Sequence, residues 1–113
     1  MLIGAPGLGP IDITLAQRIY SGRAIAIGET PVTPLNLPPG HAVRQAFMDA
    51  VMQQPDDKYI AYWTVRRHVG KGTPPRELAS AAEVIAFVQR TPGAIGYIPA
   101  SALRPEMNLL LRP

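Results

Sequence analysis

The sequence of 113 residues is long enough for one hydrophobic core and too short for two lobes, so we predict a single domain spanning residues 1–113. A hydrophobic content of 47% and a mean hydropathy of +0.07 argue against disorder, and no apolar run approaches the roughly 20 residues of a membrane span. The absence of cysteine excludes disulfides and thiolate sites, while a net charge of +3 favours anionic partners without any motif for nucleic acid.

The N-terminal third predicts a strand, a helix and two short apolar segments. Leu2–Ala5 is an apolar run before a Gly- and Pro-rich turn, which is typical of a strand, and we expect no secretory signal because the chain begins directly with it. Thr14 and Gln17 form a capping-box pattern with Thr14 as the N-cap, and Gly22 ends the helix. Two strands, or a loop and one strand, follow at Ala24–Ile27 and Val32–Leu35.

The middle of the chain predicts two helices. The Pro- and Gly-rich segment Asn36–His41 leads into a helix that runs to about Gln53, with an apolar stripe on one side. Pro55 and the two aspartates after it open the next helix, where a missing N–H and acidic side chains suit the first turn. The aromatic residues of this second helix have helical spacing, so we expect them to pack inside the protein rather than stack on bases: Tyr59, Tyr62 and Trp63.

The C-terminal third predicts a helix followed by short strands. Ser80 and Glu83 form another capping box, and the helix that they begin ends at Thr91–Gly93, because Pro cannot continue a helix and Gly permits a left-handed turn. Ala94–Ile98 then reads as a buried strand. A turn or short helix at residues 99–103 and a last strand within Met107–Leu111 complete the chain.

Patterns typical of catalytic and metal sites are missing from the sequence. His41 and His68 lack metal-ligand spacing and have no cysteine to join them, and no GxSxG nucleophile motif occurs. The few acidic residues include Asp56 and Asp57, which the helix start already explains. We therefore predict a non-catalytic protein that needs no metal and no cofactor.

One loop has a physical reason to bind an anion. The strand that ends before Asn36 delivers a loop to a helix start at Gly40 and His41, where free N–H groups and the helix dipole favour negative charge. Asn36 and His41 would supply hydrogen bonds, Arg44 would supply charge, and the basic loop 71–76 would lie nearby. The alternative is that Gly40 and His41 only cap the helix and that Arg44 is solvated.

Three stretches, in register along the chain, resemble the second lobe of periplasmic phosphate-binding proteins of ABC transporters. Leu15–Arg23 is similar to that lobe's element of helix, aromatic residue, glycine and basic residue, and Val32–Phe47 looks like its strand, anion loop and helix. The third stretch consists of Gly70–Gly72 (GKG) followed by a helix that ends in Phe87–Tyr97 (FVQRTPGAIGY), and the whole match looks most like that of short single-lobe homologues. The resemblance implies an α/β fold: a three-layer α/β/α single lobe of the type II periplasmic-binding-protein kind, with a small, mixed, largely parallel sheet flanked by about four helices.

The anion loop departs from the family pattern. Gly40 is retained, but His41, Ala42 and Val43 replace Ser-Gly-Thr, and the Arg and Asp that precede the glycine in the family are missing. The first lobe, which closes over the ligand in the two-lobe proteins, has no counterpart in these 113 residues. An anion held by one lobe stays open to water, so we expect weak binding.

The resemblance implies a non-catalytic binding protein related to phosphate ABC transporter substrate-binding components. The implied partners are phosphate or sulfate at Asn36, Gly40, His41 and Arg44, a transporter or sensor protein, and a second copy that completes the site as a homodimer. The implied compartment is the periplasm or the outside of the cell, with the cytoplasm left open. The alternative function is a degenerate lobe that serves as a protein-interaction or sensory module without a small-molecule ligand.

Overall fold

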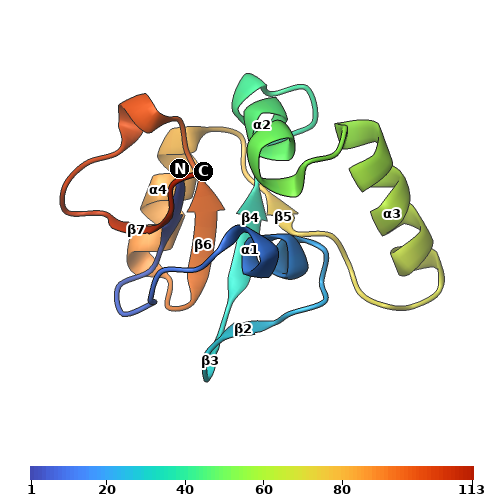
Figure 1. The fold of residues 1–113 in the computed structure, drawn as a ribbon, viewed down its shortest axis with the longest axis horizontal. Helices are drawn as coiled ribbons and strands as arrows, with labels where there is room; N and C mark the ends of the chain where they lie inside the picture. Colours follow the sequence, from blue (N-terminus) through green and yellow to red (C-terminus); the bar gives the residue numbers. More distant parts are fainter.

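The computed structural model describes all 113 residues, which form a five-stranded mixed sheet, a two-stranded hairpin and four α-helices (Figure 1). No helix is both long and apolar enough to cross a membrane. In chain order the elements are β1 (Leu2–Gly4), α1 (Ile13–Tyr20), β2 (Ala26–Ile27), β3 (Thr30–Pro31), β4 (Thr33–Asn36), α2 (Ala42–Phe47), a π-helical turn (Met48–Met52), α3 (Asp56–His68), β5 (Arg76–Glu77), α4 (Ala81–Arg90), β6 (Ala94–Tyr97), a 3₁₀ turn (Ala100–Ala102) and β7 (Asn108–Leu111).

The main sheet has the strand order β5-β4-β6-β1-β7. Strand β4 pairs in parallel with β5 and β6, whereas β1 pairs antiparallel with β6 and β7. The prediction of a mixed sheet is therefore confirmed: four of the five strands run in the same direction, and β1 alone runs opposite to them. Since β1 lies between β6 and β7, the first strand joins the last part of the chain, and the two termini end close together (Figure 1).

Helices cover both faces of the sheet, as the three-layer prediction requires. On one face Gly96 of β6 lets α4 approach, because a Cβ at this position would collide with the side chain of Val84. On the other face Tyr97 stacks on Phe47 of α2 with ring centroids 4.1 Å apart, and Phe47 lies 4.8 Å from Tyr20 of α1. These three aromatic rings fill the space between the sheet and the helices on that face.

The helix ends test the local predictions directly. Ser80 caps α4 as predicted, with its Oγ accepting from the Glu83 N–H at 3.2 Å. Helix α1 differs: Asp12, not Thr14, is the N-cap, and its carboxylate accepts from the Leu15 N–H at 2.8 Å. The predicted helix from His41 to Gln53 is α2 plus the π-helical turn, and it ends where Gln53 adopts a left-handed conformation.

The hairpin of β2 and β3 occupies the region where either two strands or a loop and one strand were predicted. Ala26 pairs with Pro31 and Ile27 with Thr30, and β4 begins two residues later. The hairpin joins no strand of the main sheet. The apolar segment 32–35 therefore contributes β4, an interior strand of the main sheet, whereas 24–27 ends in a strand of the separate hairpin.

Candidate functional site

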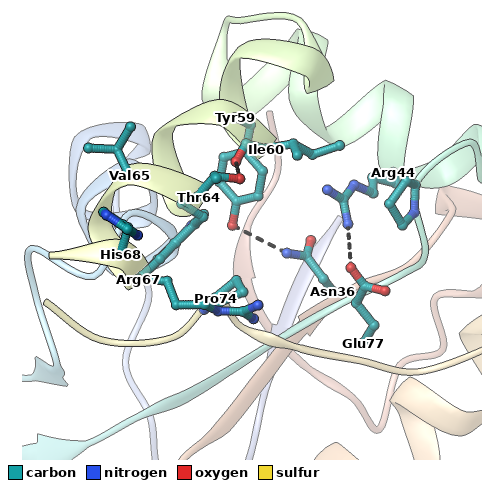
Figure 2. Close-up of a pocket in the computed structure, with 12 residues that line it drawn as sticks. Asn36, Arg44, Tyr59, Ile60, Thr64, Val65, Arg67, His68, Pro74 and Glu77 are labelled. Atoms are coloured by element: carbon teal, nitrogen blue, oxygen red, sulfur yellow. Dashed lines mark hydrogen bonds and ion pairs between the residues drawn. The ribbon is translucent and has the colours of Figure 1, made fainter. Parts of the chain in front are cut away.

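A cavity of about 830 Å³ lies between α3 and the ends of β4 and β5. Its walls include Asn36, the last residue of β4, and Glu77, the last residue of β5. These two strands are parallel, and the space outside the carboxyl ends of parallel strands is where α/β proteins commonly bind ligands. Figure 2 shows the residues that line the opposite wall, and those that come from α3 include Tyr59, Thr64 and His68.

Side chains of α3 hold this wall in place by donating to the open end of α1. The Tyr59 hydroxyl and the Trp63 Nε1–H both donate to the Tyr20 carbonyl, at 2.8 and 3.1 Å. The next two carbonyls, of Ser21 and Gly22, accept from the Tyr62 hydroxyl at 2.7 Å and from the Arg66 guanidinium at 3.4 Å. The last carbonyl groups of a helix have no hydrogen-bond partners within that helix. Here four side chains from neighbouring turns of α3 supply the missing donors. The predicted packing role of the aromatic residues is confirmed.

Asn36 forms the floor of the cavity, where two tyrosines fix the orientation of its amide. Its Oδ1 accepts from the Tyr97 hydroxyl at 2.7 Å, and its Nδ2 donates to the Tyr59 hydroxyl at 3.2 Å. Tyr59 must accept here because it donates to the Tyr20 carbonyl, and Tyr97 is free to donate because it accepts from the Leu37 N–H at 2.9 Å. Asn36 is thus a buried structural hub with 1% exposure.

Burial has a clear electrostatic consequence for the tyrosines of this network. Loss of hydration raises the pKa of Tyr20, Tyr59 and Tyr97 above the ordinary value for a phenol. For Tyr59 the hydrogen bond from Asn36 opposes this rise, and for Tyr97 the bond from the Leu37 N–H does so. All three phenols therefore remain neutral hydrogen-bonding groups near neutral pH.

Arg44 is enclosed by three elements rather than open to solvent. Its Nε and Nη2 both lie 2.9 Å from Asp56 Oδ1, and its Nη1 lies 3.2 Å from Glu77 Oε2. Nη1 also donates to the Leu37 carbonyl at 3.0 Å. The side chain is only 3% exposed, so the alternative in which Arg44 is solvated is wrong. Two carboxylates already neutralise the charge that was expected to attract an anion.

The predicted site residues are divided between the cavity and the loop beyond it. Asn36 and Arg44 line the cavity, whereas Gly40 and His41 do not. Gly40 has a positive φ of 87° and is exposed. His41 caps α2, with its Nδ1 accepting from the Val43 N–H at 3.1 Å, so the imidazole occupies a donor that an anion would have used.

Sequence reasoning did not identify the cavity's other charged residues. Arg67 and His68, in the last turn of α3, line the cavity and make no ion pair, whereas Glu77 is held by Arg44. The spacing of Ile60, Trp63 and Arg67 along one helical face is the signal that could have placed Arg67 at this wall. The basic loop 71–76 contributes only Pro74 to the lining.

The donor set favours binding through hydrogen bonds and charge. No group of three or more His, Cys, Asp or Glu side chains is placed to hold a metal ion. The cavity combines the apolar surfaces of Trp63 and Ile60 with the free cation of Arg67 and the imidazole of His68. In comparisons with known proteins, no protein-family model matches the sequence, and no curated protein shows significant similarity to it.

Proposed function

We propose that this chain is a non-catalytic binding domain, related to the substrate-binding components of phosphate ABC transporters, and that it binds a small anionic ligand in the cavity between α3 and β5. The observation that carries the proposal is the position of Arg67 and His68, two unpaired basic side chains in the wall of a cavity at the carboxyl ends of parallel strands. The relation to the transporter components rests on the three sequence stretches described above.

The size of the cavity bears on the ligand. At about 830 Å³ it falls within the range of about 300–1,000 Å³ typical of small-molecule sites. Inorganic phosphate would occupy a small part of this volume. A larger molecule that places a phosphate or carboxylate against Arg67 and an apolar part against Trp63 or Pro39 makes better use of the walls.

The charges around the cavity favour one orientation of such a ligand. Asp56, Arg44 and Glu77 together carry one net negative charge at the β5 end. Arg67 carries a positive charge at the α3 end, beside His68. An anionic group is therefore attracted to α3 and repelled from β5, which moves the proposed contact away from the first turn of α2.

The test is the thermal midpoint of unfolding in phosphate, sulfate and glycerol phosphate, each compared with chloride at equal ionic strength. A ligand at ten times its Kd stabilises by about 1.4 kcal/mol, which a melt detects easily. Arg67→Gln is expected to remove the specific shift, whereas Arg104→Gln, which changes an exposed arginine just before β7 at the opposite edge of the sheet from β5, keeps it. An equal shift in chloride, or a shift that survives Arg67→Gln, would contradict the proposal.

A second candidate function is a protein-interaction module without a small-molecule ligand. The observation in its favour is the enclosure of Arg44, which removes the one cation of the predicted anion loop. No effect of any anion on the melt beyond that of chloride would favour this function. The related transporter components work in the periplasm or outside the cell, and the first proposal implies the same compartment for this chain.

A further inference from the structure

The β5 end of the cavity carries a negative charge that the proposed anion contact does not use. Arg44 pairs with both Asp56 and Glu77, so the three side chains together leave one negative charge unbalanced. Asp56 is the better compensated carboxylate. Its Oδ1 lies 2.9 Å from two nitrogens of Arg44, and it is the first residue of α3, where the helix dipole favours negative charge. The unbalanced charge therefore falls mainly on Glu77.

Glu77 has an oxygen available for a second partner. Its Oε2 accepts from Arg44 Nη1 at 3.2 Å, whereas its Oε1 makes no hydrogen bond and no ion pair within the chain. The side chain is 48% exposed and lines the cavity, so a ligand can reach it. In the view of Figure 2, Asn36 lies between Glu77 and Arg67. The cavity thus presents an anion and a cation to a ligand at different places on its wall.

The same cavity offers apolar surface to the part of a ligand that joins its charged groups. Ile60, Trp63 and Pro74 are among the lining residues. The indole N–H of Trp63 already donates to the Tyr20 carbonyl, so this side chain offers ring surface and no free donor. An alkyl or aromatic spacer suits such a wall, because apolar contact with it requires no hydrogen bonds.

We propose that the ligand of this cavity is amphoteric, with a cationic group, an anionic group and an apolar spacer between them. The inference rests on the proposed function, which supplies the anion contact at Arg67. It adds Glu77 as the contact of an ammonium or guanidinium group. A ligand with an anionic group alone leaves the Glu77 charge unmatched, whereas an amphoteric ligand is attracted at both ends. The ω-amino carboxylates and aminoalkyl phosphates have this chemistry.

A metal ion would match the charge of Glu77 less well than an ammonium group. No group of three or more His, Cys, Asp or Glu side chains is placed to hold a metal, and the guanidinium of Arg44 lies beside the carboxylate. Metal ions such as calcium need six or more oxygen ligands, whereas an ammonium group can pair with a single carboxylate. The organic cation is therefore the better occupant of this end of the cavity.

The experiment compares ω-amino carboxylates with plain carboxylates of the same length at equal ionic strength. The probes are β-alanine, γ-aminobutyrate and ε-aminocaproate against propionate, butyrate and caproate. Trp63 is the only tryptophan and lies in the cavity wall, so its fluorescence reports binding. We expect at least one amino carboxylate to bind about fivefold more tightly than its plain counterpart, which is the gain from one partly exposed ion pair.

Glu77→Gln tests the assigned contact, and Glu106→Gln, which changes an exposed glutamate just before β7, is the matched control. In Glu77→Gln the amino carboxylate is expected to lose its advantage, and the plain carboxylate to bind more tightly because a repulsive charge is gone. Glutamine keeps an oxygen that can accept from Arg44, and the thermal midpoint checks that the variant folds. Glu106→Gln is expected to bind both classes like the wild type.

The outcomes separate this inference from the proposed function. Equal binding of amino and plain carboxylates by the wild type, or an advantage that survives Glu77→Gln, would overturn the amphoteric ligand and leave the anion contact at Arg67 in place. An advantage that Glu106→Gln removes as well would also overturn it, because the effect would then come from overall charge. No response to any carboxylate or phosphate would contradict the proposed function, and this inference with it.

Discussion

Replacing Arg44 with methionine tests how strongly this one side chain joins α2, α3 and the ends of β4 and β5. Methionine keeps much of the apolar stem but removes every hydrogen bond. The buried Leu37 carbonyl loses its 3.0 Å donor, which costs about 1–3 kcal/mol. Asp56, whose side chain is 20% exposed, loses a charge-assisted hydrogen bond worth about 1.5–3 kcal/mol. Hydration of the freed carboxylate restores only part of this stabilisation.

Glu77 adds little to this total. Its side chain is 48% exposed, so its ion pair with Arg44 is worth no more than about 1 kcal/mol. The free energy of unfolding is therefore expected to fall by about 3–4 kcal/mol, which corresponds to a thermal midpoint lower by about 10–15 °C for a domain of this size. Urea titration and thermal melting followed by circular dichroism measure both quantities.

Two further variants make the test specific to the ion pair. Arg104→Met removes an exposed arginine and is expected to change stability by less than about 0.5 kcal/mol. Asp56→Asn is expected to destabilise the wild type but to cost less in the Arg44→Met background, because the unpaired carboxylate is then gone. A loss below about 1 kcal/mol for Arg44→Met, or additive effects of the two changes, would refute the assigned role of Arg44.

Two other predictions concern the buried tyrosines and the start of α1. Because burial raises the folded-state pKa of Tyr20, Tyr59 and Tyr97, the unfolded chain loses these protons first, and stability present below pH about 10 falls above it by up to about 1.4 kcal/mol per pH unit for each phenol. Tyr97→Phe should reduce that slope by about one proton, and a slope equal to that of the wild type in urea titrations at pH 9 to 11 would contradict this. Asp12→Ala should cost about 1 kcal/mol through loss of the cap, whereas Thr14→Ala should cost less, and the opposite order in urea titrations would restore Thr14 as the cap.

Features set by residues close in sequence could be predicted well. The turn at Thr91–Gly93 and the cap at Ser80 depend on local chemistry, and both occur where the pattern places them. The prediction of Thr14 as the cap of α1 was wrong, because Asp12 and Thr14 are both good capping residues. Which of the two residues caps the helix depends on the path of the chain before it. That path is fixed by a long-range contact, because the backbone N–H of Ile11 donates to the carbonyl of Leu110, almost a hundred residues away.

The candidate site was predicted less well because its contacts are long-range. Arg44 meets Asp56 and Glu77 across 12 and 33 residues of sequence, and Asn36 meets Tyr97 across 61. No periodic pattern in the sequence predicts such pairings. From the sequence, Arg44 could therefore be interpreted only as an anion-binding residue or as a solvent-exposed one. The position of β1 between β6 and β7 depends on the same kind of long-range pairing, so the one strand that runs opposite to the others could not be placed from the sequence.

The hydrogen bonds made by the loop after β4 explain why the proposed anion contact lies on α3 and not in this loop. The Val43 N–H at the helix start is bonded to His41, and the guanidinium of Arg44 is bonded to two carboxylates and a carbonyl. An anion that entered this loop would have to displace a partner already in place, and most of its binding free energy would be lost in that exchange. Arg67 and His68 require no such exchange, since neither of them makes an ion pair. A small anion in the cavity can therefore bind at α3 without displacing an existing partner.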